Sequence, residues 1–397
     1  MSIKNSWTLR YAPIPAFYWM AYSALCGYAS FFLLGIGLNS TQTGVVIALS
    51  GAAAAFLQPL IAGFAQRPKS PSLRVLIAAS AGTLSLTALL LLILAGSVPF
   101  LTACVYSVGI VLLQTVMPLI NALGTECINQ GKKLDFGLTR GLGGLAYALT
   151  SLLMGALCAV WGTPAVPVIT ILGGGLLLFF TGQFPFRKSP SAGTGDASDQ
   201  NAGGLRFFRR YPGFLAMLAG LTLCYISHMI LNNFLLQIIL HKGGTVSDQG
   251  ISMFLACCGE VPAMMLYSRL LKRVKCAVWF KLTGFAFLLK AALSMLAPNV
   301  GLYFAVQPLQ FFAWGMVSVA AVDFVNQLMR PDDKIHGQAY ISVPLLLGSV
   351  IGSPIGGWLL DHTGLDSMMV FSTVCAAVGA AVLYMSVGRA EKEIKKA

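Results

Sequence analysis

The chain alternates between long apolar stretches and short polar ones. Twelve of the apolar stretches have roughly the 20 residues that a helix needs to cross a membrane. The predicted spans cover 12–37, 42–65, 74–95, 99–122, 138–160, 165–184, 213–239, 249–267, 277–297, 300–326, 338–360 and 367–387. Glycine, proline and charged residues mark their ends. The pattern therefore predicts an all-α membrane protein with twelve transmembrane helices.

One long polar segment separates the predicted spans into two groups of six. It covers residues 185–211 and contains the run SPSAGTGDASDQNAGG, followed by RFFRR. The Gly- and Ser-rich run is typical of a flexible linker, and the basic aromatic run is expected to lie at the anionic inner surface of the membrane. We predict an N-terminal six-helix bundle in 1–184, a cytoplasmic linker in 185–211 and a C-terminal six-helix bundle in 212–397.

The basic residues indicate how the spans are oriented. All of the 26 Lys and Arg residues except Lys242 and Lys290 lie in seven tracts, and these tracts fill every second gap between the spans. Positive charge is retained on the cytoplasmic side during insertion. Both termini are therefore expected in the cytoplasm, and Lys242 is expected outside.

Composition limits the classes of protein that the chain can belong to. With 57% hydrophobic and 10% charged residues, and a mean hydropathy of +0.78, it is too apolar for a soluble domain. The net charge of +13 would suit a nucleic-acid partner, but the charges are spread over short tracts, so we expect the lipid bilayer and no nucleic acid. The nine cysteines show no metal-ligand spacing, and no catalytic or nucleotide-binding motif occurs. We expect no enzyme activity, no metal and no cofactor.

The two halves of the sequence echo one another at an offset of about 200 residues. The fifth span begins near Gly137 and the eleventh near Gly337, while the second and eighth both open with a polar run that ends in glycine, at Gly44 and Gly250. Two related six-helix bundles that face each other across a central cavity are the architecture of alternating-access transporters.

Several segments carry a resemblance to a known family. They are LNSTQTGVVIALSGAAAAFLQPLIAGFAQR from Leu38, LDFGLTRGLGGLAYALTSLLMG from Leu134, CCGE ending at Glu260, FLLKAALSMLA around Lys290, and HGQAYISVPLLLGSVIGSPIGGWLLDHTG from His336. In these segments the chain resembles the major facilitator superfamily, and within it the lactose-permease-like branch of oligosaccharide:proton symporters. The resemblance implies the twelve-helix fold and transport of a small solute.

Ionisable residues inside predicted spans are the first candidates for function, because a charge in hydrocarbon is costly. Those proposed for proton coupling are Glu260, Lys290, His228 and Asp323. The resemblance places Glu260 at a glutamate of the coupling network and Lys290 at an arginine. Two alternatives remain open: Glu260 and Lys290 can form a purely structural ion pair, and His228 can serve as an interhelical hydrogen-bond residue.

Arg140, Gly144 and Tyr147 follow i, i+4, i+7 spacing and share one face of the fifth span. An arginine, a small residue and an aromatic ring on one face can bind a sugar or another polar ring. The resemblance matches Arg140 to a sugar-binding arginine and Tyr147 to a sugar-stacking tryptophan. It also places Asn121 where the family has the glutamate that partners this arginine. The alternative is that Arg140 is a loop-end charge and Tyr147 a packing residue.

Two further spans carry polar side chains at helical spacing. One face of the seventh span carries Tyr225, His228 and Asn232. One face of the tenth span carries Gln307, Gln310 and Trp314. So many hydrogen-bonding groups are expected to line a cavity rather than to face lipid. By resemblance, Gln310 replaces a histidine and Ala313 a proton-releasing glutamate, which leaves Glu260 as the first candidate for the proton carrier.

These features predict a secondary active transporter, with proton-coupled symport of a polar neutral solute, such as an oligosaccharide or glycoside, by alternating access. The alternative is a proton-coupled exporter of drugs or sugars. The expected partners are the solute, protons and the bilayer of a bacterial cell membrane. We expect a monomer.

Overall fold

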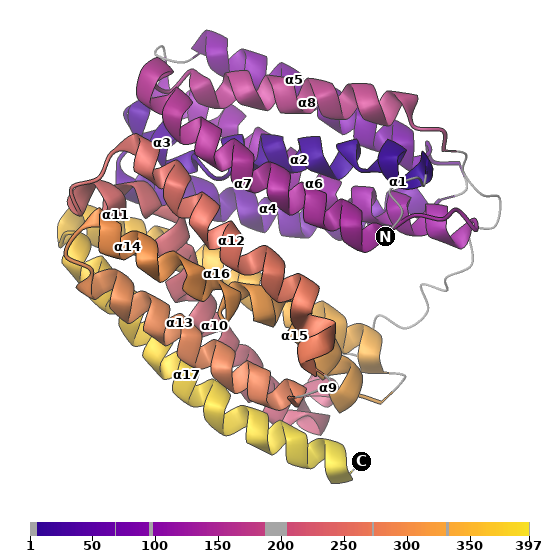
Figure 1. Cartoon of the computed structure of the whole chain (residues 1–397), viewed down its shortest axis with the longest axis vertical. Coiled ribbons are helices and arrows are strands. Elements are labelled where there is room, and N and C mark those ends of the chain that lie inside the picture. Colours follow the sequence, from indigo (N-terminus) through magenta and orange to yellow (C-terminus); the bar gives the residue numbers. More distant parts are fainter. Residues whose placement is uncertain are drawn as a thin grey trace. The chain divides into compact units, whose positions relative to one another are not determined.

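The computed structural model of the protein describes residues 6–67, 69–94, 98–186, 205–271, 274–330 and 333–396 (Figure 1). In these ranges the regular elements are all helices. The chain forms two compact units. The first contains Met1–Asn39, Val46–Gly195 and Gln249–Ile251, and the second contains Ser40–Val45, Asp196–Asp248 and Ser252–Ala397.

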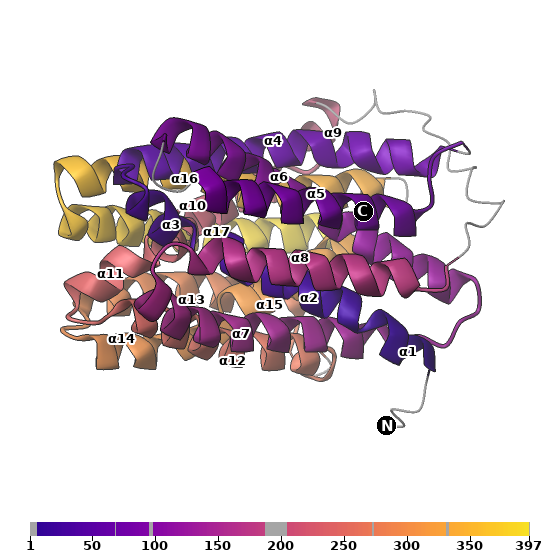
Figure 2. The same ribbon diagram turned by 90° about the horizontal axis from the view of Figure 1, so that it is seen from above.

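The first half of the chain supplies the helices of the first unit. They are α1 (Ser6–Tyr11), α2 (Pro13–Leu25), α3 (Ala29–Gly35), α4 (Ser40–Gln66), α5 (Leu73–Leu94), α6 (Pro99–Asn129), α7 (Phe136–Trp161) and α8 (Ala165–Gln183). Helix α2 packs against both α7 and α8, and α5 lies beside α8 and α6 (Figures 1 and 2). The central position of α2 therefore brings its side chains next to those of α7.

The second half supplies most of the second unit. Its elements are α9 (Leu205–Arg210), α10 (Pro212–Asn233), α11 (Leu235–His241), α12 (Val246–Leu271), α13 (Cys276–Leu296), α14 (Val300–Val306), the 3-10 helix η1 (Gln307–Phe311), α15 (Trp314–Leu328), α16 (Lys334–His362) and α17 (Leu365–Lys396). Helix α17 lies along α10 and α13, and α10 also packs against α16 (Figure 1). The core of this unit is built where α10, α13 and α15 meet.

Ten helices of the described part of the chain are long and apolar enough to cross a membrane, and the bent pair Trp7–Leu25 and Ala29–Gly35 makes up to eleven. The predicted span 249–267 corresponds to α12, which is not among them. At 26 residues this helix is nevertheless about 39 Å long, enough to cross a bilayer. The all-α membrane class is confirmed.

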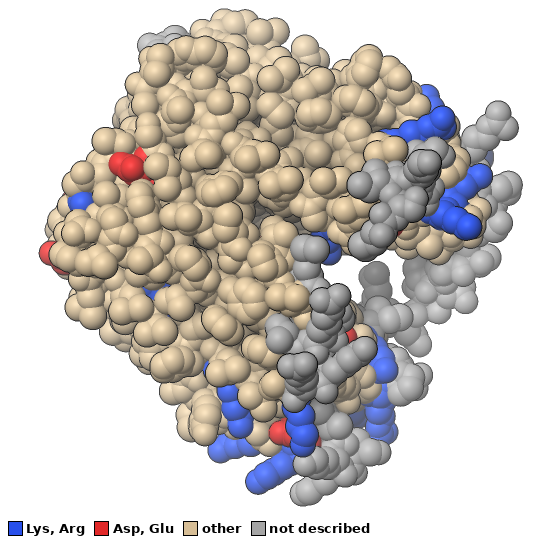
Figure 3. All heavy atoms as spheres, viewed as in Figure 1, with Lys and Arg blue, Asp and Glu red and all other residues tan. Residues whose placement is uncertain are grey.

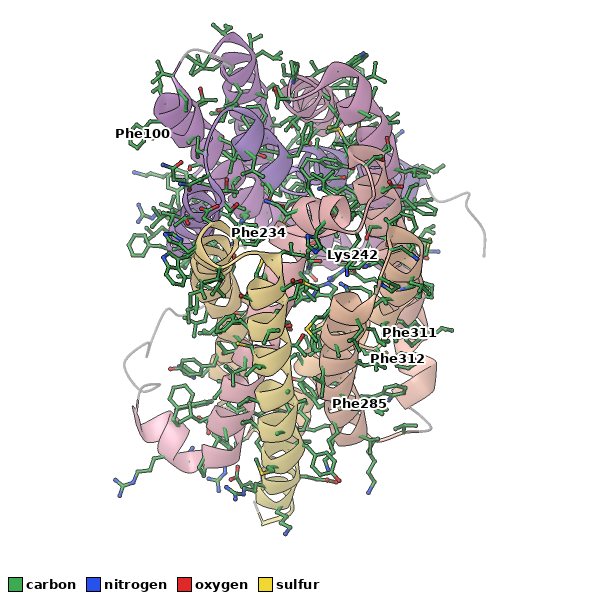
Figure 4. All side chains as sticks on the ribbon, turned by 90° about the vertical axis from the view of Figure 1, so that its left-hand side faces the viewer. Phe100, Phe234, Lys242, Phe285, Phe311 and Phe312 are labelled. Carbon is green, nitrogen blue, oxygen red and sulfur yellow. The ribbon has the colours of Figure 1, made fainter. Side chains whose placement is uncertain are left out.

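The distribution of side chains agrees with lipid as the solvent. Phe100 and Phe285 are 80% and 59% exposed and project away from their helices (Figure 4). On the face shown in Figure 3, basic side chains gather at the ends of the helices, and the surface over the middle of the helices is almost free of charge. A multi-pass membrane protein accounts for both observations.

Three of the predicted spans are broken rather than continuous. The first is interrupted between α2 and α3 with a bend of 40°, the seventh at Phe234, and the tenth between Gln307 and Ala313. At the last break Pro308 supplies no backbone N–H. The hydroxyl of Thr283 donates a hydrogen bond of 3.0 Å to the carbonyl of Phe312. Such compensation is required because lipid cannot satisfy a free backbone group.

Helix α9, within the predicted linker, packs against other helices of the second unit. The ring of Phe207 is buried and lies 5.0 Å from that of Tyr340. Arg210 forms an ion pair of 2.8 Å with Asp333, to which Tyr211 also donates a hydrogen bond. Burial alone would raise the pKa of Asp333, but the hydrogen bonds from Arg210 and Tyr211 lower it. This contact is therefore complete at neutral pH and is lost in acid as Asp333 takes up a proton. Residues 187–204 of the predicted linker lie outside the described ranges.

Lys242, the basic residue expected outside, has a structural role (Figure 4). Its ammonium group donates hydrogen bonds to the carbonyls of Ala297, at 2.6 Å, and Met295, at 3.4 Å, at the end of α13. A cation there satisfies free carbonyls and complements the helix dipole. This interaction explains why one positive charge occurs in a gap that otherwise has none.

We expect Lys242→Met to lower the free energy of unfolding by about 1 kcal/mol, because it removes the cap but keeps most of the side-chain volume. The midpoint of thermal unfolding in detergent measures this. Lys392→Met, at an exposed lysine, is the control. Equal midpoints for the two variants would contradict the capping role.

Candidate functional site

A buried lysine is the centre of the polar cluster in the second unit. Lys290 lies in the middle of α13 and is only 3% exposed. Its ammonium group donates a hydrogen bond of 2.5 Å to Oε1 of Gln310. Gln310 belongs to η1, so the break in the tenth span supplies the partner of the buried charge. A buried ammonium without such a partner would be strongly unfavourable.

Glu260 of α12 is the carboxylate that acts on this lysine. The side chain is half-buried, and its charge interacts electrostatically with that of Lys290. Two glycines allow α12 to approach the broken span. A Cβ added to Gly259 would lie 2.8 Å from the carbonyl oxygen of Pro308, and one added to Gly315 would lie 3.2 Å from Cα of Glu260. The glycines therefore place Glu260 and Gln310 on neighbouring segments.

His228 of α10 lies in an aromatic environment beside this cluster. Its ring stacks on that of Trp314, with centroids 5.2 Å apart and an interplanar angle of 8°, and it meets the edge of Phe287 at 5.5 Å. The amide nitrogen of Asn232 lies 2.8 Å from Nε2 of His228. An amide nitrogen donates, so Nε2 accepts this hydrogen bond in the tautomer whose ring proton is on Nδ1. Both residues belong to α10, so this contact lies within one helix and leaves both readings of His228, as a proton relay and as an interhelical hydrogen-bond residue, as predictions.

The other candidates of the second unit differ in their relation to the cluster. Tyr225 belongs to it, because its ring lies 5.7 Å from Trp314 and 5.8 Å from Phe287. Gln307 is buried, and its amide donates to the carbonyl of Tyr303 in its own span. Asp323 lies nine residues beyond Trp314 on α15, about 14 Å along the helix, and is half-buried. The structure does not bring Asp323 to Lys290.

In the first unit the predicted face of α7 contacts α2. The ring of Tyr147 lies 5.9 Å from that of Trp19, at 89°, and 6.5 Å from that of Tyr22. Arg140 is exposed, seven residues earlier on the same helix. Gly144 is half-buried, and the glycine that contacts Trp19 is its neighbour Gly143. Asn121 is half-buried on α6.

Three aromatic residues of these clusters were not candidates in the sequence: Trp19, Tyr22 and Phe287. Trp19 and Tyr22 occur in the run FYWMAY of the first span, where nothing in the helical spacing distinguishes a site from packing. Phe287 is three residues before Lys290, one helical turn away. This spacing could have identified Phe287 from the sequence. Trp19 and Tyr22 could not be identified in this way, because their contact with Tyr147 depends on the packing of α2 against α7.

A comparison with protein-family models gives the family. The model of the MFS_1 like family matches residues 10–373. The chain belongs to this family of the major facilitator superfamily. Among curated proteins, no sequence is significantly similar to this chain. A member of this superfamily is a membrane transporter, which agrees with the expectation that the chain is not an enzyme.

Solved structures share the fold of this MFS_1 like protein at low sequence identity. The nucleoside transporter NupG in a mutant form is 14% identical, with a TM-score of 0.80, and the match covers 96% of this chain and 99% of that one. A bacterial homologue of the human lysosomal transporter Spinster, in an inward-facing and unoccupied conformation, is 14% identical to this chain. Its TM-score is 0.68, and the match covers 99% of both chains. A bacterial homologue of the human drug peptide transporters PepT1 and PepT2 is 12% identical, with a TM-score of 0.69, and the match covers 98% of both chains.

The described residues of this MFS_1 like protein contain no group of three or more His, Cys, Asp or Glu side chains that could hold a metal ion. The polar clusters consist of amide, hydroxyl, imidazole, ammonium and carboxylate groups on separate helices. Such groups can bind a polar solute by hydrogen bonds and can exchange protons.

Proposed function

We propose that this chain is a proton-coupled secondary transporter that carries a polar, neutral solute by alternating access. The observation that supports this most is the Lys290 ammonium group, buried in the middle of a membrane helix, hydrogen-bonded to Gln310 and under the charge of Glu260. Charged side chains at this depth are costly and are typical of ion and substrate pathways.

In this proposal Glu260 binds the coupling proton. While Glu260 is ionised, its charge and the oxygen of Gln310 both stabilise the Lys290 ammonium group. When Glu260 takes up a proton, Lys290 depends on Gln310 alone, and a hydroxyl or carbonyl oxygen of the solute can accept the hydrogen bond instead. Proton and solute binding are thereby linked, because each changes the affinity for the other.

Each unit by itself contains neutral hydrogen-bonding groups and aromatic rings, and these support the proposed solute class. Asn232, Gln310, Tyr147 and Tyr225 suit hydroxyl groups and ring faces better than a formal charge. We propose a glycoside, an oligosaccharide or a nucleoside. The nucleoside is included because NupG, described as a nucleoside transporter, has the same fold. Export of a drug or sugar is the second candidate, and exposed apolar side chains do not favour it, since lipid-facing helices require them.

The cellular setting of the proposal is the bacterial cell membrane. The alternation of basic tracts supports cytoplasmic termini. We also propose that the chain acts as a monomer and that the twelve helices form two bundles, 1–184 and 212–397, joined by the segment 185–211.

Ligand stabilisation of the purified protein tests the proposed function. A ligand that binds only the folded state raises stability, by about 2.7 kcal/mol at a concentration 100 times the Kd. The panel contains nucleosides, glycosides, oligosaccharides and amphipathic drugs. We expect a rise in the thermal midpoint with a member of the first three groups. Stabilisation by drugs alone would favour the exporter instead.

A further inference from the structure

We propose that Trp19 and Tyr22 of α2, together with Tyr147 of α7, form the subsite that recognises the ring of the solute. This inference rests on the proposed function and specifies it. The subsite would take a solute in which a ring with an apolar face, such as a pyranose or a nucleobase, is combined with hydroxyl groups. Lys290, the buried cation of the second unit, is not part of this subsite.

The three rings form a single contact group within the first unit. Trp19 and Tyr22 are one turn apart on α2, with centroids at 5.2 Å and an interplanar angle of 66°. Tyr147 meets Trp19 nearly at a right angle, at 5.9 Å, and Tyr22 at 6.5 Å. The planes of the three rings therefore differ in orientation, so a flat ligand can stack on the face of one ring and contact another ring with its edge.

The exposure of these rings differs from that of a packing cluster. Tyr18, the residue before Trp19, is 1% exposed and belongs to the core. Trp19, Tyr22 and Tyr147 are all half-buried. A large aromatic residue that packs on one side and remains open on the other retains surface for a ligand. The subsite is therefore distinct from the core that supports it.

Polar groups at the same place point to a ligand. Among the described residues, the indole N–H of Trp19 and the hydroxyl of Tyr22 make no hydrogen bond to protein, and neither atom is fully enclosed. Trp and Tyr usually find a hydrogen-bond partner for these groups when they are buried. Two open donors next to three ring faces match a solute that has an apolar ring face and hydroxyl oxygens.

The backbone around the subsite is held in a fixed position. The hydroxyls of Ser23 and Ser151 are hydrogen-bonded at 2.8 Å, and Tyr28 donates to the carbonyl of Ser151 at 2.8 Å. The first contact joins α2 to α7, and the second joins the start of α3 to α7. A Cβ added to Gly143 would lie only 2.5 Å from Cδ1 of Trp19, so the indole is seated directly on the backbone of α7. A pre-ordered ring loses little entropy when a ligand binds.

Arg140 extends the same face toward one end of α7. It is exposed and lies seven residues before Tyr147, about 10 Å along the helix. A solute held by its ring at Tyr147 can reach Arg140 only with a second group, such as another sugar unit or a ribose. The subsite consequently binds the ring, and Arg140 adds affinity for solutes that are longer than one ring.

The test compares four variants in binding and in fluorescence. The probes are uridine, adenosine, methyl β-glucopyranoside and maltose, with mannitol as a polyol that has no ring. We expect Trp19→Ala to weaken binding of the ring-bearing probe that stabilises the wild-type protein by about tenfold or more, and Tyr22→Phe by about threefold to tenfold. Trp19→Phe should bind the probe but show a smaller ligand-induced change in tryptophan fluorescence than the wild-type protein.

Phe17→Leu is the matched control. Phe17 is also a half-buried ring on α2, but it stacks on Phe180 of α8, at 5.2 Å and 19°. We expect this variant to bind the probe as the wild-type protein does. Elution as a single species in gel filtration, with an unchanged midpoint without ligand, shows that each variant is folded.

The outcomes separate this inference from the proposed function. If a ring-bearing probe binds and is transported, but its affinity is the same in Trp19→Ala and Tyr22→Phe as in Phe17→Leu, the subsite is wrong and the proposed function stands. Binding of mannitol with the same affinity as the ring-bearing probes also overturns the subsite. If no sugar, glycoside or nucleoside binds the wild-type protein, the proposed function itself fails.

Discussion

Replacing Glu260 with glutamine should abolish uphill accumulation of the solute, while binding and downhill exchange persist. Glutamine keeps the volume and most of the hydrogen-bonding capacity of the side chain but cannot titrate. Within the second unit Glu260 acts on the buried Lys290, whereas the carboxylate of Asp323 lies about 14 Å along α15 from Trp314. A transporter without its proton carrier can still exchange solute but cannot use a proton gradient.

Proteoliposomes with an imposed pH gradient provide the measurement. We expect the Glu260→Gln protein to bring the inner and outer solute concentrations only to equality, where the wild-type protein accumulates solute. Asp323→Asn is the matched control, since it removes a half-buried carboxylate of the same unit, and it should accumulate normally. Uphill accumulation in Glu260→Gln together with its loss in Asp323→Asn would assign the proton carrier to Asp323.

The Lys290→Met protein should be less stable than the wild type by about 1–3 kcal/mol, because the variant leaves the buried Gln310 without its donor and removes the charge that interacts with Glu260. Methionine fills most of the lysine volume, so the loss does not reflect a cavity. The double variant Lys290→Met with Glu260→Gln should recover part of this loss, since it also removes the carboxylate whose charge acts on Lys290 in the wild-type protein. Such non-additivity is the signature of two residues that interact.

Chemical unfolding in detergent, with all four proteins of the cycle, measures this interaction. Lys281→Met is the control on the same helix, where the ammonium group lies 4.8 Å from the exposed ring of Tyr384. We expect an effect below about 1 kcal/mol for this exposed contact. Strictly additive effects of Lys290→Met and Glu260→Gln would show that the two side chains do not act on each other.

The positions of the spans could be predicted, because a helix that crosses lipid needs about 20 consecutive apolar residues. The breaks within these helices could not be predicted. A continuous apolar run such as 300–326 satisfies the length requirement whether or not its backbone is helical throughout. The break at Pro308 is stabilised by the hydroxyl of Thr283 and by the close approach of Gly259, which both come from other helices. A pattern within one segment does not contain these contacts. Helix α12 was predicted as a span from its length and its apolar residues, although it carries Asp248 and Glu260.

Part of the polar cluster of the second unit could be predicted, because some of its residues are neighbours on a single helix. His228, Asn232 and Tyr225 follow helical spacing on one helix, and the structure shows the contact between His228 and Asn232. The hydrogen bond from Lys290 to Gln310 joins two helices and was not predicted, because the sequence of one span does not indicate which residue of another span faces it. Trp19 and Tyr22 were missed because aromatic residues in a membrane helix are common and their pairing with Tyr147 is tertiary.

Proton movement that accompanies solute transport tests the central claim most directly. Wild-type protein is reconstituted in vesicles in a weakly buffered medium, a solute that stabilises it is added outside, and the external pH is followed. A proton-coupled symporter should make the medium more alkaline as solute enters, and the Glu260→Gln protein should give no pH change while it exchanges the same solute. Solute entry without any proton movement in the wild-type protein would contradict proton coupling and indicate a uniporter.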